Sequence, residues 1–228
     1  MRQLLLFILL VWAAPAFAFE AVEPRYLDPE IISPQLLPPP AKEGSKEWKQ
    51  QVAMVVAAQQ HISKSDKIAM AFEQKASVAM VTNALGKDFD AQHYPKTFAF
   101  LTQVMNDTAI VTETAKQFWG TRRPYVAAPK QVKLLIEPVK NNAYPSGHTS
   151  ISYTLSVVLG LLYPDERRLL RAKADSVAQH RIMAGVHYPE DIEGGKKLGA
   201  IVLGSMLQNS DFQDDLNEAK EEIKSHEQ

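Results

Sequence analysis

The chain has 228 residues, 46% of them hydrophobic and 22% charged, and its net charge is −1. This length and balance are typical of one compact domain with a substantial core. A net charge so close to zero gives no general attraction to polyanions, so we expect no nucleic-acid partner and only local basic sites. The chain has no cysteine, which excludes disulfide bonds and thiolate chemistry.

The first eighteen residues have the pattern of a secretory signal peptide. Arg2 precedes a mostly apolar run, and Ala16-Phe17-Ala18 is a small-x-small cleavage site. The apolar run is shorter than the roughly 20 residues of a membrane span, so an uncleaved N-terminal anchor is the weaker alternative. We therefore expect residues 1–18 to be removed and the mature chain to be periplasmic or secreted, with no stable membrane span.

Residues 19–44 form a proline-rich N-terminal arm, and residues 45–228 are expected to form the helical domain. Six prolines forbid a continuous helix in the arm. Its aliphatic residues, from Leu27 to Leu37, favour an arm that lies along the body over a free tail.

The apolar periodicity of the domain predicts an all-α fold, a single-domain bundle of about seven or eight helices. No strand alternation and no internal repeat stands out. The segment from His148 to Leu162 is almost entirely apolar, so we expect it to be the buried central helix. The expected helices begin at Ser45 and Ser65, cover residues 93–106, 108–119 and 148–162, and begin again at Pro164, Pro189 and Ser210.

Local signals mark several ends of these helices. Gly86 is expected to stop the helix that begins at Ser65, and Gly120 is expected to stop the helix over residues 108–119. Ser210 with Gln213 resembles a capping box. Residues 125–144 contain two prolines and are predicted to be a loop.

Three short stretches carry residues suited to phosphate chemistry. In the first, Lys116 lies in the last turn of an expected helix, and Arg123 follows the break at Gly120. The planar guanidinium matches phosphate oxygens, and the ammonium adds a compact charge. Taken alone, this pair is better explained as cations that complement a helix dipole.

The second stretch is Pro145-Ser146-Gly147-His148, where a loop gives way to a helix. A helix start offers unpaired backbone N–H groups and a positive dipole end, which suit an anion. Ser146 adds a hydroxyl donor, and His148 is placed to exchange a proton. The equally weighted alternative is a proline turn with a capping serine and a structural histidine.

The third stretch contains Arg181, His187 and Asp191. His187 falls in the break between two helices, so we expect solvent to reach it. Asp191, four residues on, can accept a hydrogen bond from one ring nitrogen and leave the other free to attack. Arg181 adds a second guanidinium. The alternative is an N-terminal aspartate that the helix dipole favours, beside an incidental histidine.

Together, the stretches supply two histidines, one carboxylate and three cations, a set that fits a phosphate monoester. The cations would stabilise the charge on the non-bridging oxygens in the transition state. One histidine would attack phosphorus, and the other would protonate the leaving alcohol. Two histidines and an aspartate also suit zinc, but three nearby cations would repel a metal. We therefore expect no metal and no cofactor.

The three linked motifs, K-x6-R-P, P-S-G-H and R-x5-H-x3-D, resemble the signature of the phosphatidic acid phosphatase type 2 / vanadium haloperoxidase superfamily. All spacings are kept from Lys116 to Asp191. The exported N-terminus, the arm and the tail from Asn209 to Ile223 are similar to those of the bacterial class A non-specific acid phosphatases. The resemblance therefore covers nearly the whole mature chain.

This resemblance implies an all-helical fold and a metal-free phosphohistidine mechanism that vanadate blocks. It implies that His187 is the nucleophile, that Asp191 orients it, and that His148 is the general acid and then the base. It also allows a homo-oligomer. The remaining implied role, contact with the phosphoryl oxygens, falls to Lys116, Arg123, Arg181, Ser146 and Gly147.

One position departs from the family pattern. The family usually has a serine before the arginine of the third motif, and this chain has His180. One hydrogen bond to phosphate is therefore lost or replaced, and the exchange of a neutral donor for one that can carry a charge is expected to alter the pH dependence. We expect activity to survive because the other site residues are present.

The leading interpretation is an exported phosphomonoesterase of broad specificity that acts on small phosphate esters. The first alternative is a lipid or isoprenoid pyrophosphate phosphatase, although lipid members of the superfamily are typically integral membrane proteins. A haloperoxidase is usually much larger. A non-catalytic phosphate-binding protein would not need both His148 and His187. The natural substrate, and transfer to another alcohol instead of water, stay open.

Overall fold

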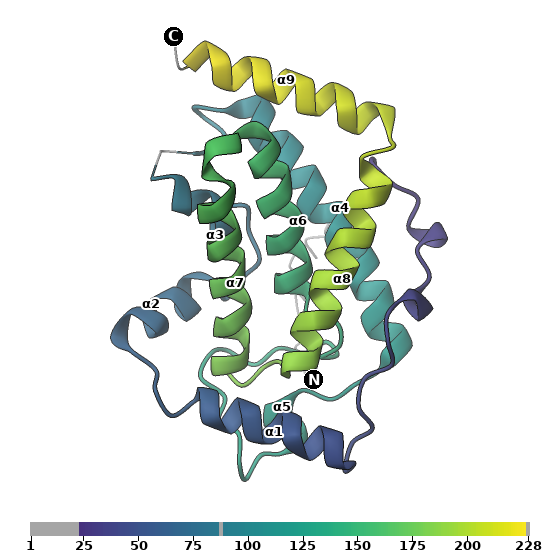
Figure 1. The fold of residues 1–228 in the computed structure, drawn as a ribbon, viewed down its shortest axis with the longest axis vertical. Helices are drawn as coiled ribbons and strands as arrows, with labels where there is room; N and C mark the ends of the chain where they lie inside the picture. The colour runs from purple at the N-terminus through teal and green to yellow at the C-terminus, as the bar shows by residue number, and fades with distance from the viewer. Residues whose placement is uncertain (1–22, 87–88, 227–228) are drawn as a thin grey trace, which may run out of the picture.

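The computed structural model describes residues 23–86 and 89–226, and in these residues it contains helices and no strands (Figure 1). The predicted all-α fold is confirmed. None of the described helices is both long and apolar enough to cross a bilayer. The predicted signal peptide lies outside the described residues.

The described residues form seven α-helices of nine or more residues and two of only four residues. Short 3-10 turns lie in the arm, after α3 and before α7. The helices are α1 (Lys46–Ala58), α2 (Lys64–Phe72), α3 (Ala79–Thr82), α4 (Pro95–Trp119), α5 (Pro124–Ala127), α6 (Gly147–Leu162), α7 (Arg167–Met183), α8 (Pro189–Met206) and α9 (Ser210–His226).

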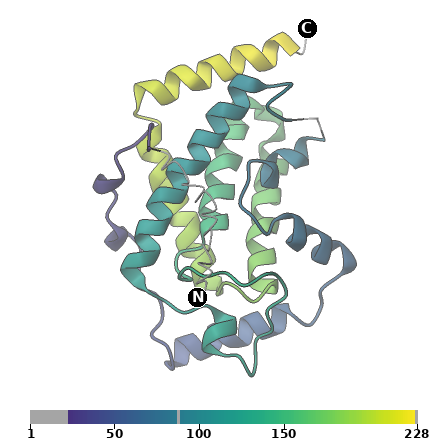
Figure 2. The same ribbon diagram turned by 180° about the vertical axis from the view of Figure 1, so that it is seen from behind.

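Helix α6 lies at the centre of the bundle, as predicted. It packs against α4, α7 and α8, and most of its residues are buried. Figures 1 and 2 show α9 crossing one end of these helices and α1 crossing the other. The C-terminal ends of α4 and α7 and the N-terminal ends of α6 and α8 all point toward α1, so four helix ends meet there.

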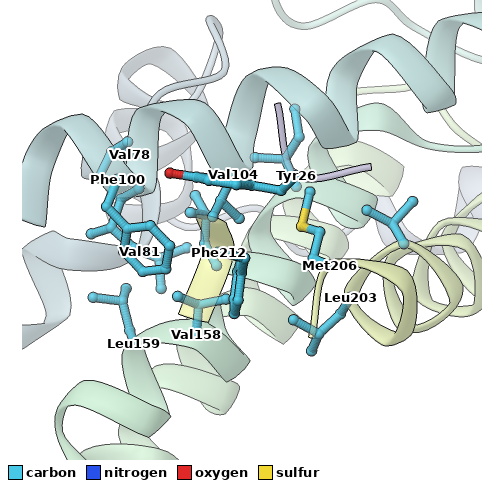
Figure 3. Close-up of a cluster of buried hydrophobic side chains, with 14 of the residues drawn as sticks. Tyr26, Val78, Val81, Phe100, Val104, Val158, Leu159, Leu203, Met206 and Phe212 are labelled. Atoms are coloured by element: carbon cyan, nitrogen blue, oxygen red, sulfur yellow. The ribbon is translucent and has the colours of Figure 1, made fainter. Parts of the chain in front are cut away.

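The main core is built by side chains from the long helices and from the arm (Figure 3). Val104 of α4, Leu159 of α6 and Met206 of α8 are fully buried. Phe212 of α9 meets the ring of Tyr26 edge-on, with centroids 5.5 Å apart. The arm therefore packs on the body and adds to its core. In residues 23–44, the described part of the arm, the buried apolar residues are Tyr26, Leu27, Ile32 and Leu37.

Glycines on α8 let this helix approach the start of α6 closely. A Cβ atom at Gly195 would lie 2.7 Å from the backbone oxygen of Ser146, and one at Gly199 would lie 2.9 Å from that of Ser150. Real Cβ atoms do not come so close to backbone, so larger residues would push the helices apart. The backbone N–H of Ser146 also donates to the backbone oxygen of Asp191, at 2.9 Å. The second and third motifs are thus joined directly.

The prediction of two helices at 93–106 and 108–119 is wrong, because α4 runs without a break from Pro95 to Trp119. Polar residues around Asp107 resemble a helix end in the sequence. In the structure, the buried Asp107 carboxylate accepts a hydrogen bond from the backbone N–H of Tyr26, at 2.7 Å. Asp107 holds the arm against α4 and does not end the helix.

The prediction of one helix over 65–85 is also wrong. Ser63, and not Ser65, caps α2, and Ser63 and Asp66 exchange hydrogen bonds in a capping box. Helix α2 ends before Glu73, and the chain becomes helical again only at α3. Glu73 interrupts the pattern because its carboxylate turns into the interior and binds side chains of α7.

Two smaller differences concern the ends of elements. Asn209 caps α9, in place of the predicted pair Ser210 and Gln213, and its side-chain oxygen accepts from the backbone N–H of Phe212 at 3.0 Å. The short helix α5 occupies the start of the predicted loop at 125–144. Gly120 ends α4, as predicted, whereas Gly86 ends the 3-10 turn Asn83–Leu85 and not a helix that begins at Ser65.

Candidate active site

The predicted site residues come together where the four helix ends meet. Nη1 of Arg123 lies 3.1 Å from Nε2 of His187, and a Cβ atom at Gly147 would lie 3.8 Å from Cε of Lys116, so the three motifs share one neighbourhood. The site residues are Lys116 in the last turn of α4, Arg123 at the N-cap of α5, Ser146, Gly147 and His148 at the start of α6, Arg181 in the last turn of α7, and His187 and Asp191 around the start of α8.

His187 is held between a carboxylate and a guanidinium. Its Nδ1 lies 3.0 Å from Oδ2 of Asp191, and its Nε2 lies 3.1 Å from Nη1 of Arg123. A carboxylate accepts and a guanidinium donates, so these partners assign the neutral tautomer with its proton on Nδ1. The lone pair of Nε2 therefore faces the guanidinium. An anion held by Arg123 would meet this nitrogen.

Asp191 fixes both the histidine and the helix that carries it. Its Oδ2 also accepts from the backbone N–H of Tyr188, at 2.8 Å, at the first turn of α8. Burial raises the pKa of Asp191, while the Tyr188 N–H and the charge of Lys116 oppose this rise. A carboxylate with two fixed donors cannot turn away from the imidazole without losing both hydrogen bonds.

The prediction that solvent reaches His187 is wrong, because the residue is only 1% exposed. Arg123 and Asp191 cover the two ring nitrogens, although the residue lies in a break between helices. Burial, and then the charges of Arg123 and Lys116, lower the pKa of His187 well below its usual value. The imidazole is therefore neutral near neutral pH, as a nucleophile requires.

Backbone carbonyl groups of the loop before α6 occupy donors of two cations. Lys116 Nζ donates to the carbonyl oxygens of Asn142 and Ala143, at 2.7 and 2.9 Å. Arg123 Nε donates to the carbonyl oxygen of Asn141, and its Nη2 donates to the side-chain oxygen of Asn141 at 2.6 Å. Burial, followed by the charge of Arg123, lowers the pKa of Lys116. A bound anion would raise the pKa of Lys116 again, because a nearby negative charge favours the ammonium form.

Arg181 has a buried donor that lacks a hydrogen-bond acceptor. Its side chain is 1% exposed, and its Nε has no hydrogen-bond partner. Burial, and then the charge of Arg123, lower the pKa of Arg181 to about 10, so the guanidinium stays charged at neutral pH. A buried charged donor without an acceptor is costly. The geometry therefore favours an anion as the partner of this group.

The start of α6 offers further donors to the same anion. Oγ of Ser146 accepts from the backbone N–H and from the hydroxyl of Thr149, so its own proton is left to donate elsewhere. The first backbone N–H groups of a helix have no partner within the helix. A Cβ atom at Gly147 would lie 3.8 Å from Cε of Lys116, so this helix start adjoins the cations.

His148 has one ring nitrogen engaged. Its Nε2 lies 2.9 Å from the backbone oxygen of Glu73, which can only accept. The ring proton of the neutral form is thus on Nε2, and Nδ1 is left to exchange a proton. Burial, and then the charge of Arg181, lower the pKa of His148 well below its usual value.

The sequence gives no sign of Glu73, which contacts His148 through its backbone and His180 through its side chain. His180 alone carries a signal, because it departs from the family pattern. This departure does not indicate which residue His180 contacts, since Glu73 is about a hundred residues away in the chain. Within residues 23–86 and 89–226, no group of three or more His, Asp and Glu side chains is arranged to hold a metal ion.

The comparisons with known proteins identify the family. The model of the PAP2 superfamily matches residues 97–213, which is just over half of the chain and includes all three motifs. The chain belongs to the PAP2 superfamily. The predicted family resemblance is therefore confirmed.

Two curated relatives cover most of this PAP2 chain. A non-specific acid phosphatase of Providencia stuartii is 26% identical over 85% of the chain and 81% of its own length. A non-specific acid phosphatase of Salmonella typhimurium is 26% identical over 97% of the chain and 92% of its own length. Among solved structures, a bacterial vanadium-dependent iodoperoxidase has a TM-score of 0.56 at 20% identity, over 76% of this chain and 52% of that one. This last likeness concerns the fold alone.

Proposed function

We propose that the chain is an exported, metal-independent acid phosphatase of broad specificity, which hydrolyses small phosphate monoesters through a phosphohistidine intermediate. Its class, a hydrolase of the acid phosphatase type, follows from the superfamily and from acid phosphatase relatives over most of the chain. The finer proposal rests on one observation. His187 is a buried, neutral imidazole whose Nδ1 binds a carboxylate and whose Nε2 faces a cluster of cations.

In the first step, Nε2 of His187 attacks phosphorus, and the bond between phosphorus and the ester oxygen breaks. The electron pair of that bond goes to the leaving oxygen, which takes a proton from Nδ1 of His148. Asp191 accepts the hydrogen bond from Nδ1–H of His187 and stabilises the positive ring that forms. The products are an alcohol and a phosphohistidine.

In the second step, a water molecule attacks the phosphohistidine. His148, now neutral, takes a proton from this water as the P–N bond breaks. The electron pair returns to Nε2 of His187, and inorganic phosphate leaves. The sum of the two steps is ester plus water giving alcohol plus phosphate, with both histidines restored.

Lys116, Arg123 and Arg181 would hold the non-bridging oxygens during both steps. Arg181 already has a buried donor without a partner. Lys116 and Arg123 would exchange carbonyl oxygens of residues 141–143 for phosphoryl oxygens, which carry more charge. A dianion here would also raise the pKa of His148, because it offsets the charges that lower it. The acid would thus become protonated when substrate binds.

Release of p-nitrophenol from p-nitrophenyl phosphate at mildly acid pH, with a chelator present, tests this proposal. The mature chain should be active with the chelator, inhibited by vanadate, and inactive as His187→Ala. Loss of activity on chelation would contradict the metal-free mechanism. Tight phosphate binding without any turnover would favour the non-catalytic alternative, and turnover of phosphatidic acid vesicles or isoprenoid diphosphates alone would favour the lipid alternative. Sequencing the N-terminus of the exported chain tests cleavage after Ala18.

A further inference from the structure

Glu73 lies just beyond the end of α2 and is completely buried, although it is a carboxylate. Oε1 of Glu73 accepts from Nζ of Lys173 at 2.7 Å, and Oε2 accepts from Nδ1 of His180 at 2.7 Å. Both partners come from α7. The side chain therefore fastens the end of α2 to the helix that carries Arg181.

The backbone of the same residue reaches the active site. Nε2 of His148 donates to the carbonyl oxygen of Glu73, at 2.9 Å. This carbonyl lies at the C-terminal end of α2, where a helix leaves its last carbonyl groups unpaired. The position of the Glu73 carbonyl thus decides where the ring of His148 points, and the carboxylate contacts decide where Glu73 lies.

A buried carboxylate stays ionised here because its donors outweigh its burial. Burial alone would raise the pKa of Glu73, but hydrogen bonds from His180 and Lys173 outweigh it, so the pKa lies below its usual value. Removal of either His180 or Lys173 would leave the buried carboxylate of Glu73 with only one of its two side-chain donors. The chain after Glu73 is irregular until α3, so no helix would then hold the carbonyl in place.

We propose that Glu73, fixed by His180 and Lys173, is a positioning residue for the general acid, and that its backbone oxygen aims Nδ1 of His148 at the leaving group. The proposal rests on the proposed role of His148. It also gives His180 a function in this chain. In place of the serine usual in the family, His180 acts through Glu73 and not on the phosphate.

The neighbouring site residue supports this assignment. His180 and Arg181 are adjacent in the last turn of α7, and both are buried. Nδ1 of His180 faces Glu73, and its Nε2 lies 3.6 Å from the Asp66 carboxylate. Both ring nitrogens thus face carboxylates, whereas the charge of Arg181, after burial, lowers the pKa of His148. A serine at position 180 would be too short to replace the bond to Glu73.

Rates on two substrates with different leaving groups distinguish a misplaced His148 from a general loss of folded protein. An alkyl phosphate needs its leaving oxygen protonated, whereas p-nitrophenolate leaves readily without a proton. For Glu73→Gln and for His180→Ser, we expect kcat/KM on an alkyl phosphate to fall about ten- to a hundredfold, part of the effect of a full general acid. On p-nitrophenyl phosphate we expect kcat/KM to change less than about threefold, since loss of this leaving group depends little on the acid. The second step, in which His148 is the base, follows loss of the leaving group and does not enter kcat/KM.

The two variants should also behave as one unit. The double variant should be no worse than the more impaired single variant, because both changes release the same carbonyl. Asp175→Asn is the matched control. It removes an α7 carboxylate that pairs with Arg171 and Lys196 and contacts no site residue, so both substrates should keep their wild-type rates. Inhibition by inorganic phosphate should be unchanged in all variants, since the cations are intact.

The outcomes distinguish a failure of the positioning role of Glu73 from a failure of the proposed phosphatase function. An equal fall on both substrates, or no fall on either, in folded variants would overturn the positioning role while leaving the phosphatase in place. A wild-type chain that hydrolyses neither substrate would overturn the proposed function and the inference together. If Glu73→Gln fails to fold by circular dichroism, His180→Ser decides, because it keeps the buried carboxylate paired with Lys173.

Discussion

At the scale of single residues, the site depends on where two imidazole protons lie. His187 keeps its proton on Nδ1, toward Asp191, and His148 keeps its proton on Nε2, toward the Glu73 backbone. The two nitrogens without protons are left for the reaction. Small changes in the partners of these rings should therefore change rates more than they change stability.

Asp191→Asn should leave the fold intact and lower kcat by about a hundred- to ten-thousandfold, because an amide can present its N–H to Nδ1 and so favour the wrong tautomer. Steady-state rates with p-nitrophenyl phosphate, beside thermal unfolding of both proteins, measure this. Glu193→Gln is a suitable control, since Glu193 is an exposed carboxylate on the same helix. A variant as active as wild type would remove Asp191 from the mechanism.

Binding of sulfate should be accompanied by proton uptake at about pH 6, where an ordinary histidine is largely protonated. Burial and the nearby cations lower the pKa of His148 and of His187 in the free protein, so the free rings are neutral there. A dianion raises these pKa values, so the complex holds more protons than the free protein, and affinity should rise as pH falls. Calorimetry in two buffers of different ionisation enthalpy measures the uptake.

Sulfate suits this experiment because it stays a dianion across the pH range, so the protons taken up belong to the protein. His148→Ala should take up fewer protons than wild type. Release of protons on binding, or no proton exchange, would contradict the claim that both site histidines are neutral in the free protein at this pH.

The three motifs predicted eight site residues, and the structure brings these residues together where helix ends meet. Their catalytic and binding roles stay predictions. Glu73 could not be predicted. Its carboxylate pairs with α7 and its carbonyl with α6, across contacts that no local pattern encodes. The burial of His187 was also missed, since a break between helices usually lies at the surface.

At the scale of elements, the close approach of α8 to α6 sets the distance between the second and third motifs. Gly195→Ala would place a Cβ against the Ser146 carbonyl, so overpacking of about 1–3 kcal/mol should exceed the helix propensity gain of about 1 kcal/mol. We expect lower stability to urea and a lower kcat/KM.

Gly204→Ala is the matched control on the same helix, since nothing lies within 4 Å of a Cβ atom there. It should be stabilised by about 0.4–1 kcal/mol and keep full activity. If Gly195→Ala behaved like Gly204→Ala, the close approach of the two helices would not matter for the site.

Elements with strong periodicity, such as α1, α6 and α8, could be predicted from the sequence. The errors lie where a polar side chain serves another segment. Asp107 resembles a helix end because its partner is the distant arm, and Glu73 breaks a helical pattern because its partners are on α7. Apolar periodicity shows which face of a segment is buried. It gives no information about a polar side chain that binds a distant segment.

At the scale of the whole molecule, the arm is held by a buried charge. Asp107→Ala would leave the backbone N–H of Tyr26 buried without an acceptor, at a cost of about 1–3 kcal/mol. Urea unfolding should show this loss, whereas Asp214→Ala, an exposed carboxylate on α9, should change little. Equal stability of the two variants would mean that the arm does not depend on this contact.

Trapping of the phosphoenzyme tests the central claim most directly. His148→Ala should still phosphorylate His187 from p-nitrophenyl phosphate, because this leaving group needs little acid, but it lacks the base for the second step. Base quenching and mass spectrometry should then find phosphate on the peptide that contains His187, and none in His187→Ala. Wild-type turnover with no phosphoenzyme in His148→Ala, or phosphate on any other residue, would contradict the phosphohistidine mechanism.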